Sequence, residues 1–203
     1  MKYVSIDIET TGLDPETCQI IQIGAVIEDT LVEKPIDQLP SFQCLVEHSQ
    51  ISGSPFALKM NAGILEKLGE LERADRKDRS DLRKRYNIIP PSLVAKSFKM
   101  WLASNGFDNF EDLPISITAA GKNFATFDKL FLQKLPSWGT AISIKQRVID
   151  PAILFMDWQN DQTLPNLKQC MERAGIDGEV THDALQDAID VVRVVRAARR
   201  NKN

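Results

Sequence analysis

The chain has 203 residues, of which 43% are hydrophobic and 26% are charged, and its formal net charge is −3. A chain of this length and composition can bury a sizeable core, which excludes intrinsic disorder, collagen-like repeats and small disulfide-stapled scaffolds. The slight negative charge excludes a global positive field that would draw the chain to nucleic acid or to a membrane surface. Any polyanion binding must therefore be local or must depend on metal ions.

Cysteine usage and hydropathy bear on the compartment. The three cysteines, Cys18, Cys44 and Cys170, lie far apart and form no CxxC pair, which favours a reducing cytoplasm and argues against a zinc site. No apolar run approaches the ~18 residues that are needed to span a bilayer, and acidic residues near the N-terminus exclude a signal-peptide core. We therefore expect a cytoplasmic protein with no membrane partner.

The first third of the chain predicts three strands. Over residues 2–9, Val4, Ile6 and Ile8 alternate with polar residues, so that one face of the strand is apolar and the other ends in two carboxylates. Residues 20–27 and 41–47 predict a second and a third strand. Their short connections indicate an antiparallel meander.

The remainder alternates between helices and strands. Helical periodicity predicts helices over residues 55–68, 92–103, 124–135, 164–174 and from about 182 to 200. Apolar runs predict a strand at 115–119 and a strand or strand end within 147–155. This order indicates one α/β domain over residues 1–203.

Two charged segments each have alternative interpretations. Residues 70–85 contain five acidic and seven basic residues, within a charged insertion at about 69–89, and predict either a solvated helix or loop or a mobile basic lid that touches a substrate. The basic residues near the C-terminus predict a solvated polar face, with phosphate contact as the alternative. They are Arg193, Arg196, Arg199, Arg200 and Lys202.

Asp7 and Glu9 lie two residues apart on the first strand, so both side chains leave the same face. Two neighbouring carboxylates on a buried strand repel each other unless one is protonated or a divalent cation lies between them. Hard oxygen ligands of this kind select Mg²⁺ or Mn²⁺ over zinc. The alternative is an exposed strand end with two solvated acids.

Two further acids have an informative context. Asp128 lies among aromatic residues at the start of a predicted helix, where an unpaired carboxylate is costly to bury. Asp187 lies five residues after His182, about one and a half turns along the predicted last helix. The imidazole of His182 would then hang over the helix start while Asp187 points into the site.

Three motifs in order carry a resemblance to a known family. Residues 7–13 read Asp-x-Glu-x-Thr-Gly-Leu, residues 123–128 read Asn-x-x-x-Phe-Asp and residues 182–188 read His-x-Ala-Leu-x-Asp-Ala. They resemble the motifs of the DEDDh 3′→5′ exonucleases, a superfamily that includes the proofreading epsilon subunit of bacterial replicative polymerase, ribonuclease T and oligoribonuclease. The resemblance covers about residues 2–200.

The resemblance implies a ribonuclease-H-like fold with a mixed five-stranded sheet, in which three antiparallel opening strands are followed by parallel ones. It implies that two Mg²⁺ or Mn²⁺ ions are held by four carboxylates and that a histidine is the general base. On this chain these are Asp7, Glu9, Asp128 and Asp187, with His182 as the base. The implied activity is hydrolysis of single-stranded RNA or DNA from its 3′ end, which releases nucleoside 5′-monophosphates.

Other matching positions imply contacts with the substrate. Thr10, Thr11, Gly12 and Leu13 match the segment that cradles the terminal nucleotide in the family. Asn123 and Phe127 match the second motif, and the alternative for them is turn hydrogen bonding and core packing.

Two departures from the family pattern leave substrate preference open, because Asn61 and Lys122 stand where many relatives have histidine.

The alternative function is a proofreading or accessory subunit that acts mainly by docking on a polymerase or nuclease complex. A homodimer and a polymerase partner both stay open.

Overall fold

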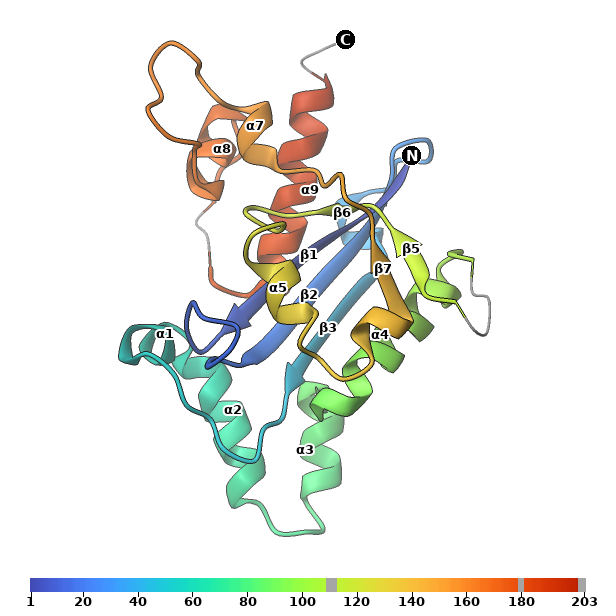
Figure 1. Ribbon diagram of the computed structural model, residues 1–203, viewed down its shortest axis with the longest axis vertical. Helices are drawn as coiled ribbons and strands as arrows, with labels where there is room; N and C mark the ends of the chain where they lie inside the picture. Colours follow the sequence, from blue (N-terminus) through green and yellow to red (C-terminus); the bar gives the residue numbers. More distant parts are fainter. Residues whose placement is uncertain (109–112, 179–180, 201–203) are drawn as a thin grey trace.

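The computed structural model describes residues 1–108, 113–178 and 181–200. Within these ranges a mixed five-stranded sheet has helices on both faces (Figure 1). Its strands are β1 (Lys2–Thr10), β2 (Ile20–Asp29), β3 (Ser41–Val46), β4 (Ile88–Ile89) and β6 (Ala119–Ala120), in the order β4-β3-β2-β1-β6. A separate parallel pair consists of β5 (Ile115–Ile117) and β7 (Ile142–Ile144).

The strand directions confirm the predicted fold class. Strands β1 and β2 pair antiparallel, as do β2 and β3. The β3–β4 and β1–β6 pairs are parallel. The strand or strand end expected within residues 147–155 is present only as a parallel bridge at Ile149, and a longer strand, β7, lies before it. Asp150 caps a short helix at Pro151 through its side chain, which leaves only an isolated bridge between Ile149 and Ala120.

The helices are shorter and more numerous than periodicity predicts. Those on the sheet faces and at its lower edge are α1 (Pro55–Met60), α2 (Ala62–Arg73), α3 (Arg79–Tyr86), α4 (Pro91–Ser104), α5 (Asp128–Leu132), α6 (Trp138–Ala141), α7 (Pro151–Leu154), α8 (Leu167–Arg173) and α9 (Ala184–Arg200), with a 3₁₀ turn at Ile36–Gln38. The single helix expected over 55–68 breaks at Asn61, and that expected over 124–135 is helical only in α5 and is preceded by turns. No helix among the described residues is long and apolar enough to cross a membrane.

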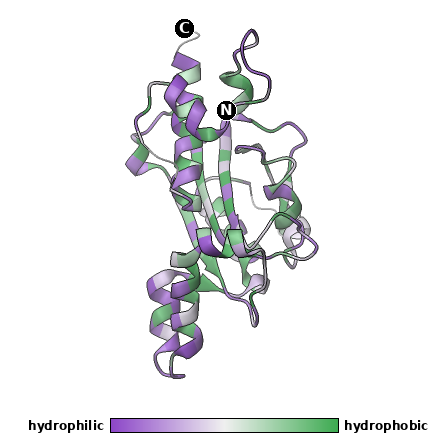
Figure 2. Ribbon diagram, turned by 90° about the vertical axis from the view of Figure 1, so that its left-hand side faces the viewer, coloured by the Kyte–Doolittle hydropathy of each residue, from purple (hydrophilic) through white to green (hydrophobic). Residues whose placement is uncertain are grey.

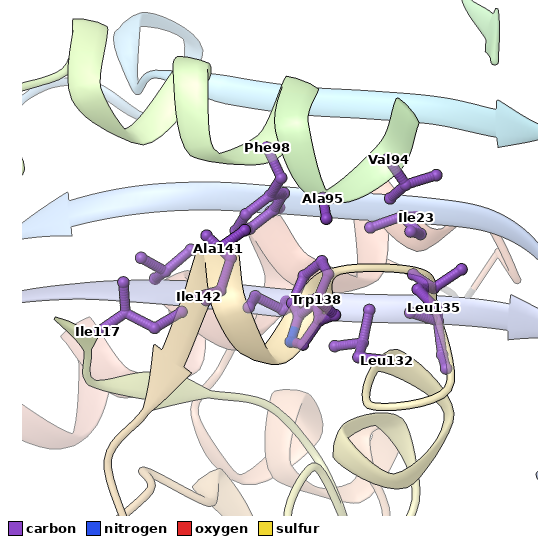
Figure 3. Close-up of a cluster of buried hydrophobic side chains, with 14 of the residues drawn as sticks. Ile23, Val94, Ala95, Phe98, Ile117, Leu132, Leu135, Trp138, Ala141 and Ile142 are labelled. Carbon is purple, nitrogen blue, oxygen red and sulfur yellow. The ribbon is translucent and has the colours of Figure 1, made fainter. Parts of the chain in front are cut away.

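Both faces of β1 are buried, and each face meets a different core. Val4, Ile6 and Ile8 pack with α4, α5 and α6 in the larger core, around the fully buried rings of Phe98 and Trp138 (Figure 3). The alternate residues of β1 face α9 on the other side of the sheet. Burial on both faces makes the strand rigid, which suits it to hold a site.

Helix α9 is amphipathic and covers the second face of the sheet. Its valines, such as Val191 and Val195, pack on β1 and β2, while its polar side faces outward (Figure 2). The arginines of this helix are engaged within the protein. Arg196 and Glu28 form a buried ion pair at 2.6 Å, and Arg193 donates to Asp190.

The charged segment forms a helical hairpin of α2 and α3, called here the charged hairpin, which projects beyond the sheet (Figure 1). Ile64, Leu68 and Leu71 of α2 pack against Ile21 of β2 and Leu45 of β3, so the base of the hairpin is anchored. Arg83 of α3 also forms a bidentate pair with Glu47.

Candidate active site

Strand β1 carries Asp7 and Glu9 at its C-terminal end, on the face that α9 covers. The pairing of β1 with β2 shifts register between Glu9 and Thr10. Such a bulge ends regular pairing and redirects the chain, so Thr10 leads away from the sheet immediately after the second carboxylate. Asn61 supports this end of the strand, because its Nδ2 donates to the carbonyl of Thr10 at 3.1 Å.

Asp128 reaches the site from the other side of the sheet, as the first residue of α5. The turn that leads to α5 passes close to β1: a Cβ on Gly121 would lie 2.8 Å from the carbonyl oxygen of Ile6. Helix α5 contacts β1 directly (Figure 1). Asp128 is 3% exposed, and the nearby backbone amide of Ile8 favours the ionised form of its carboxyl.

The start of α9 supplies the last two residues of the predicted site. The side chain of Asp183 accepts from the amides of Leu185 and Gln186 at 3.1 Å each, which caps the helix. The helix therefore begins at Ala184. The sequence predicts a start at about His182, and the helix begins two residues later because the cap residue Asp183 precedes it. His182 is exposed and has a φ of 53°, in the left-handed region that non-glycine residues rarely adopt.

Three of the predicted residues converge closely. Glu9, His182 and Asp187 each offer a ligand atom, and these atoms all lie within 4.8 Å of one another. Glu9 and Asp187 are buried, whereas His182 is exposed. Asp7 keeps some solvent-accessible surface although protein surrounds it densely, and the charges of Asp128, Asp187 and Glu9 act on it. The structure therefore gathers the five residues from β1, α5 and the start of α9 at one end of the sheet.

Crowding and burial make these carboxyls reluctant to ionise. Burial, followed by the charge of Asp187, raises the pKa of Glu9 to about 7, although the hydrogen bond from Asn61 opposes the shift. Burial raises the pKa of Asp128 to about 7, and burial raises that of Asp187 to about 6 against the opposing charge of His182. Burial and the neighbouring carboxylates raise the pKa of Asp7 well above its ordinary value.

The residues fit a divalent cation. Among the described residues, no lysine or arginine forms a salt bridge with any of the four carboxyls. Asp187 keeps one carboxylate oxygen, Oδ1, that is buried and has no hydrogen-bond partner within the described part of the chain. Buried carboxylates without a counter-charge are costly, and hard oxygen donors are the ligands that Mg²⁺ and Mn²⁺ prefer. The site therefore has negative charge without a positive partner, and it has the oxygen donors that a hard cation needs.

The predicted substrate-binding residues divide into two groups. Thr10, Thr11, Gly12 and Leu13 form a turn beside Glu9, in which Thr10 Oγ1 donates to the Gly12 carbonyl at 2.7 Å. Leu13 is 84% exposed and points its side chain to solvent beside the site.

Asn123 and Phe127 form the second group and, like the buried Thr10 and Thr11, they make their contacts within the protein. Asn123 has a φ of 58°, and its side chain accepts a hydrogen bond from Lys122. Its backbone N–H donates to the side chain of Asp150. Phe127 packs on Phe131 with ring centroids 5.0 Å apart. These contacts correspond to the alternative interpretation of turn hydrogen bonding and core packing.

Sequence reasoning missed several residues that place the site. Gly24 pairs with Asp7 and Gln22 pairs with Glu9 across the β1–β2 ladder, and both lie under the start of α9. A glycine in the interior of an otherwise apolar strand is the signal for a close backbone approach. Asp183, directly before an apolar periodic run, is the signal for a helix cap.

No protein-family model and no curated protein matches the sequence of this chain. Solved structures are nevertheless similar in fold. The chain superimposes on cell-death related nuclease 4 (CRN-4) with a TM-score of 0.61 and 14% identity, over 100% of this chain and 64% of that one. For E. coli Exonuclease I in complex with a dT13 oligonucleotide the TM-score is 0.57 and the identity 14%, over 99% and 42%.

A third similar structure is a full-length 3′-exonuclease, with a TM-score of 0.58 and 17% identity over 99% of this chain and 81% of that one. The chain spans less than two thirds of the length of CRN-4 and of Exonuclease I. At these identities the likeness establishes the fold. The chain adopts the ribonuclease-H-like fold that these exonuclease structures share.

Proposed function

We propose that this protein is a metal-dependent 3′→5′ exonuclease that hydrolyses the terminal phosphodiester bond of single-stranded nucleic acid. The observation that carries the proposal is the convergence of buried, uncompensated carboxyls with an exposed histidine, in the fold of known exonucleases. The whole chain would form one exonuclease domain, into which the charged hairpin is inserted.

Asp7, Glu9, Asp128 and Asp187 would hold two Mg²⁺ or Mn²⁺ ions. Cations held there would stabilise the negative charge that develops on the attacking and leaving oxygens during hydrolysis. The four carboxyls supply the negative charge for this, and their places on β1, α5 and α9 fix their positions. The cations would also offset the repulsion between an acidic site and the phosphate.

His182 would be the general base. It is exposed at the mouth of the site, close to Glu9 and Asp187, so its imidazole can meet a water that enters with the substrate. A histidine can take a proton near neutral pH. The water oxygen would bond to phosphorus as the bond to the 3′-oxygen breaks, with the water's proton passing to His182 and a solvent proton to the leaving oxygen.

The turn at residues 10–13 would contact the terminal nucleotide. Leu13 offers an exposed apolar side chain to a base, while the buried Thr10, Thr11 and Gly12 hold the shape of the turn that carries it. The Exonuclease I structure that resembles this chain holds a dT13 oligonucleotide, which supports single-stranded nucleic acid as the substrate class.

The test is a time course on single-stranded RNA and DNA of the same sequence, labelled at the 5′ end, with Mg²⁺, with Mn²⁺ and with EDTA. We expect a ladder that shortens from the 3′ end, depends on the metal and is absent for Asp7→Ala. The faster ladder identifies the preferred sugar. If folded protein with metal degrades neither strand, the exonuclease proposal is wrong and a docking role on a polymerase or nuclease complex becomes the better explanation.

A further inference from the structure

The start of α9 is attached to the sheet by polar contacts that lie outside the five proposed catalytic residues. Gln22 of β2 donates to Asp183 Oδ2 at 3.0 Å and accepts from the amide of Ala184 at 3.1 Å. Gln43 of β3 donates to the same oxygen at 3.1 Å. Asp183 therefore joins two neighbouring strands to the first turn of the helix.

Both oxygens of Asp183 accept more than one hydrogen bond. Oδ1 accepts from the amides of Leu185 and Gln186, which caps the helix, and also from Gln43 at 3.3 Å. Oδ2 accepts from both glutamines and so fixes the cap to the sheet. A helix cap needs only the bonds from the helix amides, since one side-chain oxygen is enough to satisfy them.

These contacts lie between the two halves of the site. Gln22 stands directly opposite Glu9 in the β1–β2 ladder. On the helix side, Asp183 follows His182 directly, and its backbone carbonyl accepts from the amide of Asp187 at 2.9 Å. Asp183 is thus hydrogen-bonded to the backbone of Asp187 and joined through the chain to His182.

We propose that Asp183, held by Gln22 and Gln43, is a positioning residue that sets His182 and Asp187 at their distance from Asp7 and Glu9. The inference rests on the proposed exonuclease function, and it assigns to Asp183 no contact with the substrate. A displacement of about 1 Å in a catalytic group can lower a rate roughly 100-fold. The attachment of α9 to β2 and β3 therefore affects the rate of hydrolysis more than the affinity for the substrate.

Gln43→Ala is the main test, because it removes one donor to Asp183 without changing any charge in the site. Asp183→Asn is the second test. Its remaining side-chain oxygen can still cap the helix, but the NH₂ that replaces the other oxygen faces either the glutamine donors or the helix amides and cannot accept a hydrogen bond from them. Gln38→Ala, at an exposed glutamine in the 3₁₀ turn, is the matched control. The measurements are kcat and KM on a short single strand, the melting temperature, and its rise on addition of Mn²⁺.

We expect Gln43→Ala and Asp183→Asn each to lower kcat roughly 10- to 100-fold, with KM within about twofold of the wild-type value. The double variant should lose no more than the larger single loss, because Gln43 acts through Asp183. Gln38→Ala should match the wild type. Unchanged kcat in Gln43→Ala, or losses that multiply in the double variant, would overturn the inference.

Failure of the exonuclease proposal gives a different pattern. If the wild-type protein hydrolyses neither RNA nor DNA, the Mn²⁺-induced rise in melting temperature still reports on the geometry of the carboxyls. A smaller rise in Gln43→Ala than in Gln38→Ala then supports positioning by Asp183. An equal rise in the two variants counts against it.

Discussion

Gly24 lies against the backbone of Ala184, the first residue of α9. A Cβ at Gly24 would stand 2.2 Å from the carbonyl carbon of Ala184, which is closer than any real contact. Gly24 is also the ladder partner of Asp7, so the lack of a side chain at this position allows the start of α9 to pack close to the carboxylates.

Gly24→Ala should therefore disturb both stability and activity. The added methyl must push α9 away from β2, and we expect the free energy of unfolding to fall by about 1–3 kcal/mol. Nuclease activity should fall further than this loss of folded protein explains, since the displaced helix carries Asp187. The control is Gly63→Ala, at an exposed position of α2 where a Cβ meets nothing within 4 Å. Chemical denaturation and activity assays of both variants check the prediction, and equal behaviour of the two would contradict it.

The stability of the metal-free protein should fall as pH rises. The pKa values of Glu9, Asp128 and Asp187 are about 7, about 7 and about 6 in the folded protein, above the usual carboxyl range. The folded state therefore binds more protons than the unfolded chain between about pH 4 and pH 7, so the free energy of unfolding decreases across that window.

Saturating Mg²⁺ or Mn²⁺ should reverse this trend, because the cation binds the ionised native site. Thermal melts from pH 4 to pH 8, with EDTA and with Mn²⁺, measure both effects. Asp187→Asn should flatten the metal-free profile. A metal-free stability that increases toward pH 7 would show that these carboxyls are not held against ionisation.

His182→Ala should separate proton transfer from metal binding. If the imidazole acts as a base, the variant should lose about 10²–10⁴-fold in kcat while it retains most of its Mn²⁺ affinity. Glu9→Gln, which removes a proposed ligand, should lose both. Calorimetric titration with Mn²⁺ beside rate measurements distinguishes the two, and a wild-type rate in His182→Ala would exclude the base role.

The charged hairpin provides a test of the lid hypothesis. Deleting residues 70–86 would remove Leu71 and Leu82 from the cluster that anchors the hairpin, so charge reversal of exposed residues is the cleaner change. Reversal of Lys77, Lys84 and Arg85 to glutamate should weaken binding of long single strands and leave cleavage of dinucleotides unaltered.

The control for the hairpin is the same reversal at exposed lysines outside it, namely Lys34, Lys145 and Lys168. Binding titrations with strands of increasing length measure the effect. Equal changes for long strands and dinucleotides would reject a lid, and no change at all would support a solvated hairpin.

The Arg196–Glu28 pair should matter for stability. Arg196 is 6% exposed and Glu28 is fully buried, so Arg196→Met leaves a buried carboxylate without its partner. We expect the free energy of unfolding to fall by about 3–5 kcal/mol. Arg200→Ala, which breaks an exposed pair with Glu33, should cost at most about 1 kcal/mol. Urea unfolding of both variants tests this, and similar losses would mean that burial does not set the cost.

The sequence by itself predicts the opening strands and the identity of the acids. Alternation in residues 2–9 requires two faces, and the only carboxylates on that strand fall at its end, so Asp7 and Glu9 follow from a period of two residues. Similarly, the period of the last apolar run predicts a helix that carries Asp187, although its first residue depends on which side chain caps it.

Only the tertiary structure decides how the parts of the site meet. Asp128 and Asp187 are far from Asp7 in the chain, and they approach it because α5 and α9 lie on opposite faces of the same strand. The close approach of α9 depends on Gly24, and its attachment depends on Gln22, Gln43 and Asp183. Local patterns cannot report such contacts, because each one joins residues whose separation in space is set by packing of the whole sheet.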